Sequence, residues 1–404
     1  MKKYLAMLLA GAMCVSLMAG CGGGDKSAST GTASSNTASS GASADGSAET
    51  GVLKIGGIGP LTGGAAVYGI ATKQGAEIAV QEINAKGGLQ LSLDFQDDEA
   101  DPEKGVNAYN KLKGDGMQVV YGCTTTGSCL AVAAETFNDR IFQLTPSASS
   151  ADVTAGKDNV FQICFTDPGQ GAKSAEYIAT KGLASKVAII WKNDDVYSKG
   201  IHDTFVEEAA ARNLAIVSDT TFADGNDTDF SVQLNNAKDA GADLVFLPMY
   251  YQPASLIFAQ AKAMGYAPTW FGVDGMDGIL TMDGFDTSLA EGVILLTPFS
   301  ADASDEKTQN FVKKYQDQFG ETPNQFAADA YDCVYAIKQA LENAGCTPDM
   351  SNADLCAAML EQFTTMTFEG LTGDGAGITW TADGAVSKSP KGMVIQDGAY
   401  VGLD

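Results

Sequence analysis

Two runs rich in hydroxyl side chains follow apolar segments in the first half of this chain of 404 residues. The first is Gly122–Ser128 and the second is Thr145–Ser150. Serine and threonine hydroxyls, together with the free backbone amides at the start of a helix, form good sites for a carboxylate. Either run alone is also a common helix cap. Because two such runs follow neighbouring predicted strands, we favour a carboxylate-binding site.

An acidic residue in the second half of the chain has an unusual setting. Asp274 stands in Gly272–Gly275, directly after an apolar stretch that predicts a buried strand. A charge there is costly unless a cation meets it. A bound ammonium group would be such a cation, with Tyr197 and Tyr250 as aromatic walls and hydroxyl donors. The alternative is an ordinary turn aspartate.

The glycine-rich loop Gly57–Gly64 ends the first predicted strand and precedes Tyr68. It predicts a loop that passes close to a ligand, with Tyr68 over it, or simply a tight turn. A dinucleotide fingerprint fails because Thr62 stands where the third glycine belongs, and no Gly-Lys-Ser/Thr loop occurs in the sequence. We therefore do not expect a nucleotide site.

Composition favours binding over catalysis. With 25 Lys and Arg against 50 Asp and Glu, the net charge is −25, which repels nucleic acid and anionic lipid headgroups. The only histidine is His202, so a Ser-His-Asp triad or a multi-histidine metal site would have to include it. A hydrolase using two carboxylates needs a second acid opposite Asp274, and the strand ends offer only Asp274 clearly. We expect no enzyme activity, metal or cofactor.

From Val52 onward, short apolar runs alternate with segments of helical period. Apolar runs such as Leu53–Ile58 and Leu244–Leu247 predict strands buried on both faces. Strands that alternate with helices predict parallel sheets flanked by helices, an α/β fold. Two such blocks in series predict two lobes, and the last segment has β-like patterns with Asp-Gly turns at residues 383–384 and 397–398.

The N-terminal sequence is typical of an export signal. Lys2 and Lys3 precede an uncharged apolar stretch, which is too short for a comfortable membrane span. Leu17–Cys21 resembles a bacterial lipobox, in which the cysteine is lipidated; the alternative is a plain secretory signal. Residues 22–50 contain no Leu, Ile, Val or aromatic residue, which predicts a disordered linker. We expect an extracytoplasmic protein anchored to the membrane through a lipid on Cys21.

Six cysteines remain in the predicted body, and none forms a Cys-x-x-Cys pair: Cys123, Cys129, Cys164, Cys333, Cys346 and Cys356. Export permits disulfides. Their positions in apolar runs are equally typical of small buried hydrophobic residues. The pairing stays open.

The body, from about Val52 to Tyr400, resembles the leucine/isoleucine/valine-binding proteins, substrate-binding components of ABC importers. The matching stretches are Ile58–Gly63, Tyr68-Gly69, Ile83–Gly88, Asp97-Asp98 with Asp101-Pro102, Thr145-Pro146 and Tyr197–Gly200. The resemblance implies a type I periplasmic binding fold, two α/β lobes joined by three crossings. It implies a signal peptide and linker (1–20, 21–51), a first lobe (52–167 and 299–372) and a second lobe (168–298 and 373–404).

The resemblance also implies roles for particular residues. The ligand's carboxylate would meet the hydroxyl of Thr126, with Ser128 as the fallback. Asp274 would bind its ammonium group, although glutamate is common there among branched-chain binders. The remaining implied contacts, from the loop after the fourth strand and from the aromatic positions, are Ser147, Ala148, Ser149, Tyr68, Tyr197 and Tyr250.

The function so implied is that of a monomeric binding protein whose lobes close like a hinged trap on an amino acid, branched-chain or otherwise aliphatic. Its partners would be the ligand and the transmembrane subunits of an ABC permease. The alternatives are the same fold with an amide, urea or an aromatic carboxylate as ligand, or a sensor subunit. The shorter acid at Asp274 leaves the ligand's side chain open.

Overall fold

The computed structural model describes residues 51–373 and 375–403. The predicted signal peptide (1–20), the predicted lipidation site Cys21 and residues 22–50 of the predicted linker lie outside these described residues. Within them, no helix combines the length and the apolar character needed to cross a membrane.

The first sheet contains five parallel strands in the order β2-β1-β3-β4-β5. The strands are β1 (Val52–Gly59), β2 (Gln90–Asp97), β3 (Val119–Gly122), β4 (Phe142–Thr145) and β5 (Val160–Gln162). Successive side chains of a strand point to opposite faces. Val119 and Tyr121 accordingly pack on one side of the sheet, and Val120 packs on the other.

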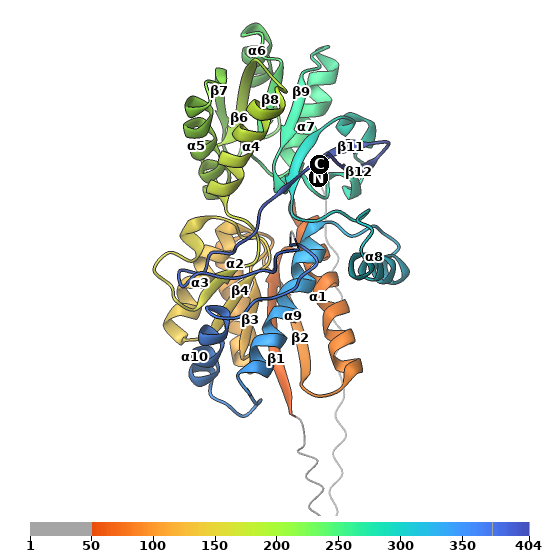
Figure 1. Ribbon diagram of the computed structural model, residues 1–404. Helices are drawn as coiled ribbons and strands as arrows, with labels where there is room; N and C mark the ends of the chain where they lie inside the picture. Colours follow the sequence, from red (N-terminus) through yellow and green to blue (C-terminus); the bar gives the residue numbers. More distant parts are fainter. Residues whose placement is uncertain (1–50, 374, 404) are drawn as a thin grey trace, which may run out of the picture. The chain divides into compact units, whose positions relative to one another are not determined.

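Helices cover both faces of this sheet, which together with them forms the first lobe (Figure 1). One layer contains α2 (Pro102–Gly114) and α3 (Thr126–Asp139). The other contains α1 (Ala66–Lys86) and α9 (Gln325–Asn343), with α10 (Asn352–Phe363) near β4. Asp101 fixes the start of α2 by accepting a hydrogen bond from the Lys104 N–H at 2.9 Å, and Pro102 follows it.

The second sheet has seven strands in the order β12-β11-β10-β9-β8-β6-β7. The parallel strands are β6 (Lys186–Lys192), β7 (Ala215–Phe222), β8 (Leu244–Leu247), β9 (Thr269–Gly272) and β10 (Ile294–Thr297). β11 (Lys391–Gln396) and β12 (Ala399–Gly402) add an antiparallel hairpin, so this sheet is mixed rather than wholly parallel. The predicted turn at Asp397-Gly398 is confirmed between the two hairpin strands.

The second lobe consists of this sheet and its helices. α4 (Asp167–Lys181) and α5 (Val196–Ala211) cover one face, and α6 (Ser231–Asp239) and α7 (Tyr251–Ala263) cover the other. α4 and α5 approach closely because Gly171 has no side chain. A Cβ there would lie 2.2 Å from the Ile201 carbonyl oxygen, which is in α5. Short 3-10 helices are η1 (Ala151–Val153), η2 (Asp274–Met276), η3 (Ile279–Thr281) and η4 (Thr287–Ala290).

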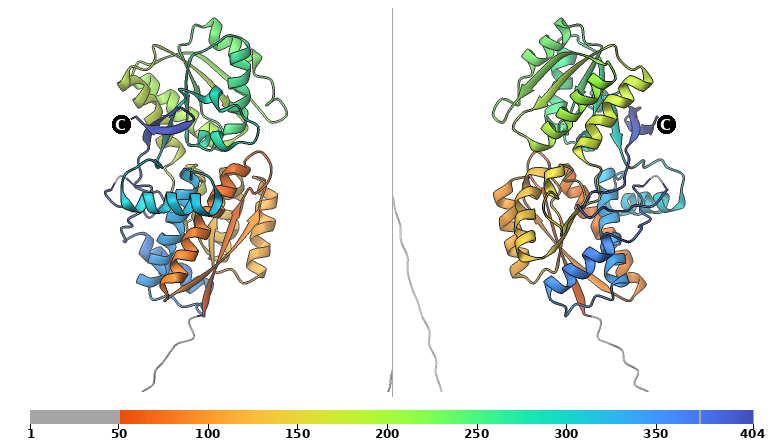
Figure 2. Two further views of the ribbon diagram at one scale, coloured as in Figure 1. Left: turned by 90° about the vertical axis from the view of Figure 1, so that its right-hand side faces the viewer. Right: turned by 60° about the vertical axis from the view of Figure 1, so that its left-hand side comes forward.

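The chain crosses between the lobes three times, as Figures 1 and 2 show. It leaves the first sheet after β5, leaves the second after β10 through α8 (Glu306–Phe319), and returns to β11 after α10. The third crossing is fixed by a buried ion pair between Lys388 and Asp329 of α9, 2.8 Å apart, with side chains 1% and 3% exposed. The observed fold is the two-lobed α/β architecture that the sequence predicts.

Candidate functional site

The nine residues predicted to contact a ligand lie where elements of the two lobes face each other. Thr126 and Ser128 are in the first turn of α3, Ser147–Ser149 follow β4, and Tyr68 is in α1. From the second lobe, Tyr197 is in the first turn of α5, Tyr250 precedes α7 and Asp274 begins η2 after β9. Eight of the nine are buried, and Tyr250 is half-buried.

Asp274 has a buried carboxyl group with partners on one oxygen. Its Oδ1 accepts hydrogen bonds from the Tyr197 hydroxyl at 2.5 Å and from the Gly275 N–H at 2.8 Å. Burial raises the pKa of Asp274 to about 6, although Tyr197, Gln170 and the Gly275 N–H act to lower it. These contacts hold the carboxyl in one orientation but supply no positive charge.

Three tyrosines line the junction between the lobes. The rings of Tyr197 and Tyr250 stack with their centroids 4.7 Å apart, and Tyr68 packs edge-on to Tyr250 at 5.5 Å. The Tyr68 hydroxyl donates to the Gly275 carbonyl and accepts from the Tyr251 N–H at 3.1 Å. Tyr68 of the first lobe is therefore bonded directly to the segment that carries Asp274.

The Tyr250 hydroxyl lies within the electrostatic influence of nearby acids. Burial raises its pKa, and the charges of Asp195, Asp167 and Asp274 raise it further. The backbone N–H of Thr126 acts in the opposite direction. The start of α3 thus lies next to the aromatic wall around Asp274.

The predicted hydroxyls differ in whether they are already used. Buried without any hydrogen-bond partner are Thr126 Oγ1, Ser149 Oγ and also Thr125 Oγ1, which was not predicted. By contrast, Ser128 donates to Asp98 Oδ2 at 2.6 Å and Ser147 donates to the Thr124 carbonyl at 2.5 Å. Since a hydroxyl has one proton to donate, Ser128 and Ser147 are less able to donate to a ligand.

Ala148 has no free backbone group directed at a ligand. Its N–H donates to Thr145 Oγ1 at 2.9 Å, and its carbonyl accepts from Gln162 Nε2 at 2.7 Å. These bonds shape the loop after β4 and leave the hydroxyl of Ser149 as its available group.

Two further polar side chains of α4 reach the same region, and the sequence analysis did not select them. Neither carboxyl oxygen of Asp167 has a hydrogen-bond partner, and the residue is fully buried. Gln170 accepts from the Asp274 N–H through Oε1 at 3.1 Å, whereas its Nε2 is unpartnered. An acid at the start of a helix is ordinary in a sequence, so nothing marked Asp167 as exceptional.

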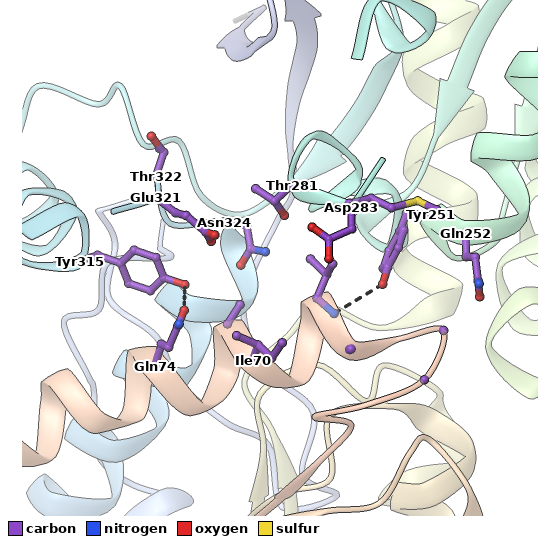
Figure 3. Close-up of a pocket in the computed structure, with 16 residues that line it drawn as sticks. Ile70, Gln74, Tyr251, Gln252, Thr281, Asp283, Tyr315, Glu321, Thr322 and Asn324 are labelled. Carbon is purple, nitrogen blue, oxygen red and sulfur yellow. Dashed lines mark hydrogen bonds between the residues drawn. The ribbon is translucent and has the colours of Figure 1, made fainter. Parts of the chain in front are cut away.

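Two pockets are lined by residues of both lobes. One, of about 360 Å³, includes Thr125, Asp195 and Tyr250 in its lining, with Phe222 and Met249 as apolar walls. The other, of about 380 Å³, lies along α1 and contains none of the nine predicted residues (Figure 3). In it Tyr315 bonds to Gln74. The first pocket therefore adjoins the predicted site and the second does not.

Within the ranges 51–373 and 375–403, no group of three or more His, Cys, Asp or Glu side chains is arranged to hold a metal ion. The six cysteines of the body are buried and unpaired in the structure.

Comparison with known proteins gives consistent matches. Residues 52–397 match a family described as periplasmic binding protein. Leu/Ile/Val-binding protein homolog 3 of Brucella melitensis is 32% identical over 305 residues, covering 74% of this chain and 80% of the relative. A branched-chain amino acid transporter substrate-binding protein of Streptococcus pneumoniae, solved with isoleucine, is 28% identical with a TM-score of 0.78, covering 87% of this chain and 98% of that one.

A more distant structure shows the same fold. A solute-binding protein of an ABC transporter from R. palustris, solved with benzoate, is 22% identical with a TM-score of 0.77 and covers 87% of this chain and 96% of that one. The fold and the interlobe polar groups define a periplasmic binding protein, a class that binds solutes and is not enzymatic. Within that class, the chain belongs to the Leu/Ile/Val-binding protein family.

Proposed function

We propose that this protein binds an amino acid between its two lobes and delivers it to the permease of an ABC importer. The observation that carries the proposal is the placement of opposite functions on opposite lobes. Asp274 of the second lobe is buried and oriented but lacks a cation, and Thr126 and Ser149 of the first lobe have unused hydroxyls. A zwitterion satisfies both sides: its ammonium group at Asp274 and its carboxylate at the hydroxyls.

An aliphatic, branched-chain side chain is part of the proposal. Its support is the similarity to proteins named for leucine, isoleucine and valine, one of them solved with isoleucine. The pocket beside Tyr250 offers Phe222 and Met249 as apolar walls. Burying one aliphatic side chain contributes about 1.5–3 kcal/mol.

Closure of the lobes would couple binding to transport. The lobe boundaries that we propose are 52–167 with 299–372, and 168–298 with 373–404. A ligand shifts the protein towards the closed form only if it binds that form better than the open one. Contacts from both lobes to one zwitterion meet this requirement, and the permease would then recognise the closed form.

The rival ligand is an aromatic carboxylate, since a protein of the same fold was solved with benzoate. Asp274 argues against it, because an anionic ligand without an ammonium group leaves a buried carboxyl uncompensated. A screen of amino acids, amides and aromatic acids by thermal shift separates the two.

Asp274→Ala tests the site. We expect amino-acid affinity to fall by about 2–5 kcal/mol, because the ammonium group loses its buried partner. Isothermal titration calorimetry measures this, with Asp283→Ala as the control, since Asp283 is exposed and lines the pocket of Figure 3 instead. Unchanged affinity in Asp274→Ala would show that the ammonium group binds elsewhere.

The membrane anchor at Cys21 is a separate part of the proposal and rests on the sequence, since Leu17–Cys21 resembles a lipobox. We expect the full-length protein to fractionate with membranes and the Cys21→Ala variant to remain in the extracytoplasmic soluble fraction. Equal fractionation of the two would contradict the anchor.

A further inference from the structure

A third pocket, of about 390 Å³, lies beside the second crossing between the lobes. The second lobe lines it with Asp277, Leu280 and Tyr400 of β12, and the first lobe lines it with Val312 of α8. It shares Glu321 and a few neighbouring residues with the pocket of Figure 3. None of the nine residues predicted to contact the amino acid lines it, so the pocket is distinct from the predicted amino-acid site.

Asp277 has a buried carboxyl group of which the fold uses one oxygen. The residue is 4% exposed, and its Oδ2 accepts a hydrogen bond from the Gln325 N–H at 2.8 Å. Its Oδ1 has no hydrogen-bond partner within the described chain. The nearby Tyr400 hydroxyl accepts from the Gly278 N–H at 2.9 Å and makes no hydrogen bond to Oδ1. A buried carboxyl oxygen without a partner is costly, and a cation bound in the pocket would offset that cost.

The charges around the pocket have one sign. Among the residues that the structure describes, the charged side chains lining it are all acidic: Asp277, Asp302 and Glu321. Asp277 is buried, whereas the other two are exposed. Burial raises the pKa of Asp277 to about 6, and the charge of Asp329 raises it further against hydrogen bonds that lower it. Such surroundings attract a cation and repel a carboxylate.

The same pocket has apolar walls. Phe299 and Val312 are buried, and Leu280 and Ala301 are partly buried and pack against the same core. A ligand suited to this pocket therefore combines an ammonium group with an apolar body, because each part then meets a matching wall.

We propose that this pocket is a second binding site, for a small primary amine without a carboxylate group. Its ammonium group pairs with Asp277, and its apolar body contacts Phe299 and Val312. The site goes beyond the proposed function and does not depend on it. An amino acid is disfavoured here because its carboxylate would face Asp302 and Glu321 instead of the hydroxyl donors of the predicted amino-acid site.

Two probes of the same shape test the charge requirement. 3-Methylbutylamine carries an ammonium group on a branched aliphatic body, and 3-methylbutan-1-ol carries a hydroxyl group in its place. The full chain and its Asp277→Asn variant are titrated with each probe by calorimetry. Asp283→Asn is the matched control, because Asp283 is exposed and lines the neighbouring pocket of Figure 3 but not this one.

We expect the wild type and the control to bind the amine equally, and Asp277→Asn to bind it about tenfold more weakly or worse, the usual loss for a hydrogen bond to a charged group. The alcohol should bind weakly and equally to all three proteins. Equal amine affinities of Asp277→Asn and the wild type would overturn the proposal, as would a wild type that binds no amine.

A second variant guards against a folding defect in Asp277→Asn. Ala399→Trp leaves Asp277 and its bond to Gln325 in place but adds a bulky side chain at an exposed position that lines the pocket. We expect this variant to lose amine binding as well, and unchanged amine binding would overturn the proposal.

The predicted amino-acid site is the other place where an amine could bind. A loss of amine affinity in Asp274→Ala but not in Asp277→Asn would place the amine there and overturn the second site. The proposed function is tested separately, by the affinity of Asp274→Ala for amino acids, so the two proposals can fail independently.

Discussion

Buried aspartates lie both at the hinge and at the cleft between the lobes, but the two groups differ in the hydrogen-bond and ion-pair partners that the fold provides. At the hinge, Asp329 pairs with Lys388, and Asp332 accepts from the N–H groups of Leu371 and Thr372 and from the Thr372 hydroxyl at 2.6–2.9 Å. At the cleft, Asp167 has no partner, and Asp274 has donors but no cation.

This difference distinguishes aspartates that stabilise the fold from aspartates that are available to bind a ligand. A buried charge with its own partner stabilises the fold only while both members remain. A buried charge without a partner lowers the stability of the ligand-free fold, and binding of a ligand of opposite charge restores that stability. The same residue type can therefore be assigned opposite roles, and each assignment predicts a different result on mutation.

Breaking the hinge pair should have the largest effect. Lys388→Met leaves Asp329 buried without its cation, and we expect a loss of about 3–5 kcal/mol in the free energy of unfolding. Chemical denaturation measures the loss. Lys262→Met is the matched control, because its pair with Asp286 is exposed and worth at most about 1 kcal/mol. Similar losses in both variants would contradict the structural role of the hinge pair.

The raised pKa of Asp274 at the cleft should make the stability of the protein depend on pH. Burial raises the pKa of Asp274 to about 6 in the folded protein, against about 3.9 in an unfolded chain. The folded form therefore binds this proton more tightly. Its contribution to stability is full below about pH 4 and is lost as the pH rises through about 6, about 3 kcal/mol in all.

Asp274→Asn removes this titration. Between pH 4 and pH 7 the ligand-free wild type should lose about 2 kcal/mol more stability than the variant. Taking the difference cancels the contribution of Asp329, whose pKa burial also raises to about 6 and which is not among the charges that act on Asp274. If the stability of the two proteins changes with pH in parallel, the pKa of Asp274 is not raised in the ligand-free protein.

The smallest effect compares two serines of one loop. Ser149→Ala should weaken amino-acid binding by about 0.5–1.5 kcal/mol with little change in stability, because its hydroxyl has no partner in the protein. Ser147→Ala should instead lower stability by a similar amount, because its hydroxyl donates to the Thr124 carbonyl. Calorimetry and thermal unfolding of both variants measure the contrast; reversed results would exchange the two roles.

The sequence was most informative where local pattern and burial agree. Asp274 was identifiable because glycines flank it after a strongly apolar strand, a position where a solvated acid is not expected. The hydroxyl runs were also identifiable, but sequence does not tell which hydroxyls are already bonded. Ser128 and Ser147 proved to have partners in Asp98 and the Thr124 carbonyl, which come from tertiary structure.

Asp167 was missed for a different reason. It begins α4, and an acidic residue at the start of a helix is too common in sequences to indicate a site. Gly171 is required by packing against α5 rather than by the helix itself. The three-residue strand β5 is too short to show a period in the sequence.

The contact at Gly171 also limits how this protein can be redesigned. α5, which lies against that glycine, carries Tyr197, so any side chain at position 171 would push the aromatic wall away from Asp274. Attempts to convert the protein into a biosensor for another solute should therefore vary the pocket walls and leave this glycine untouched, although it never meets the solute.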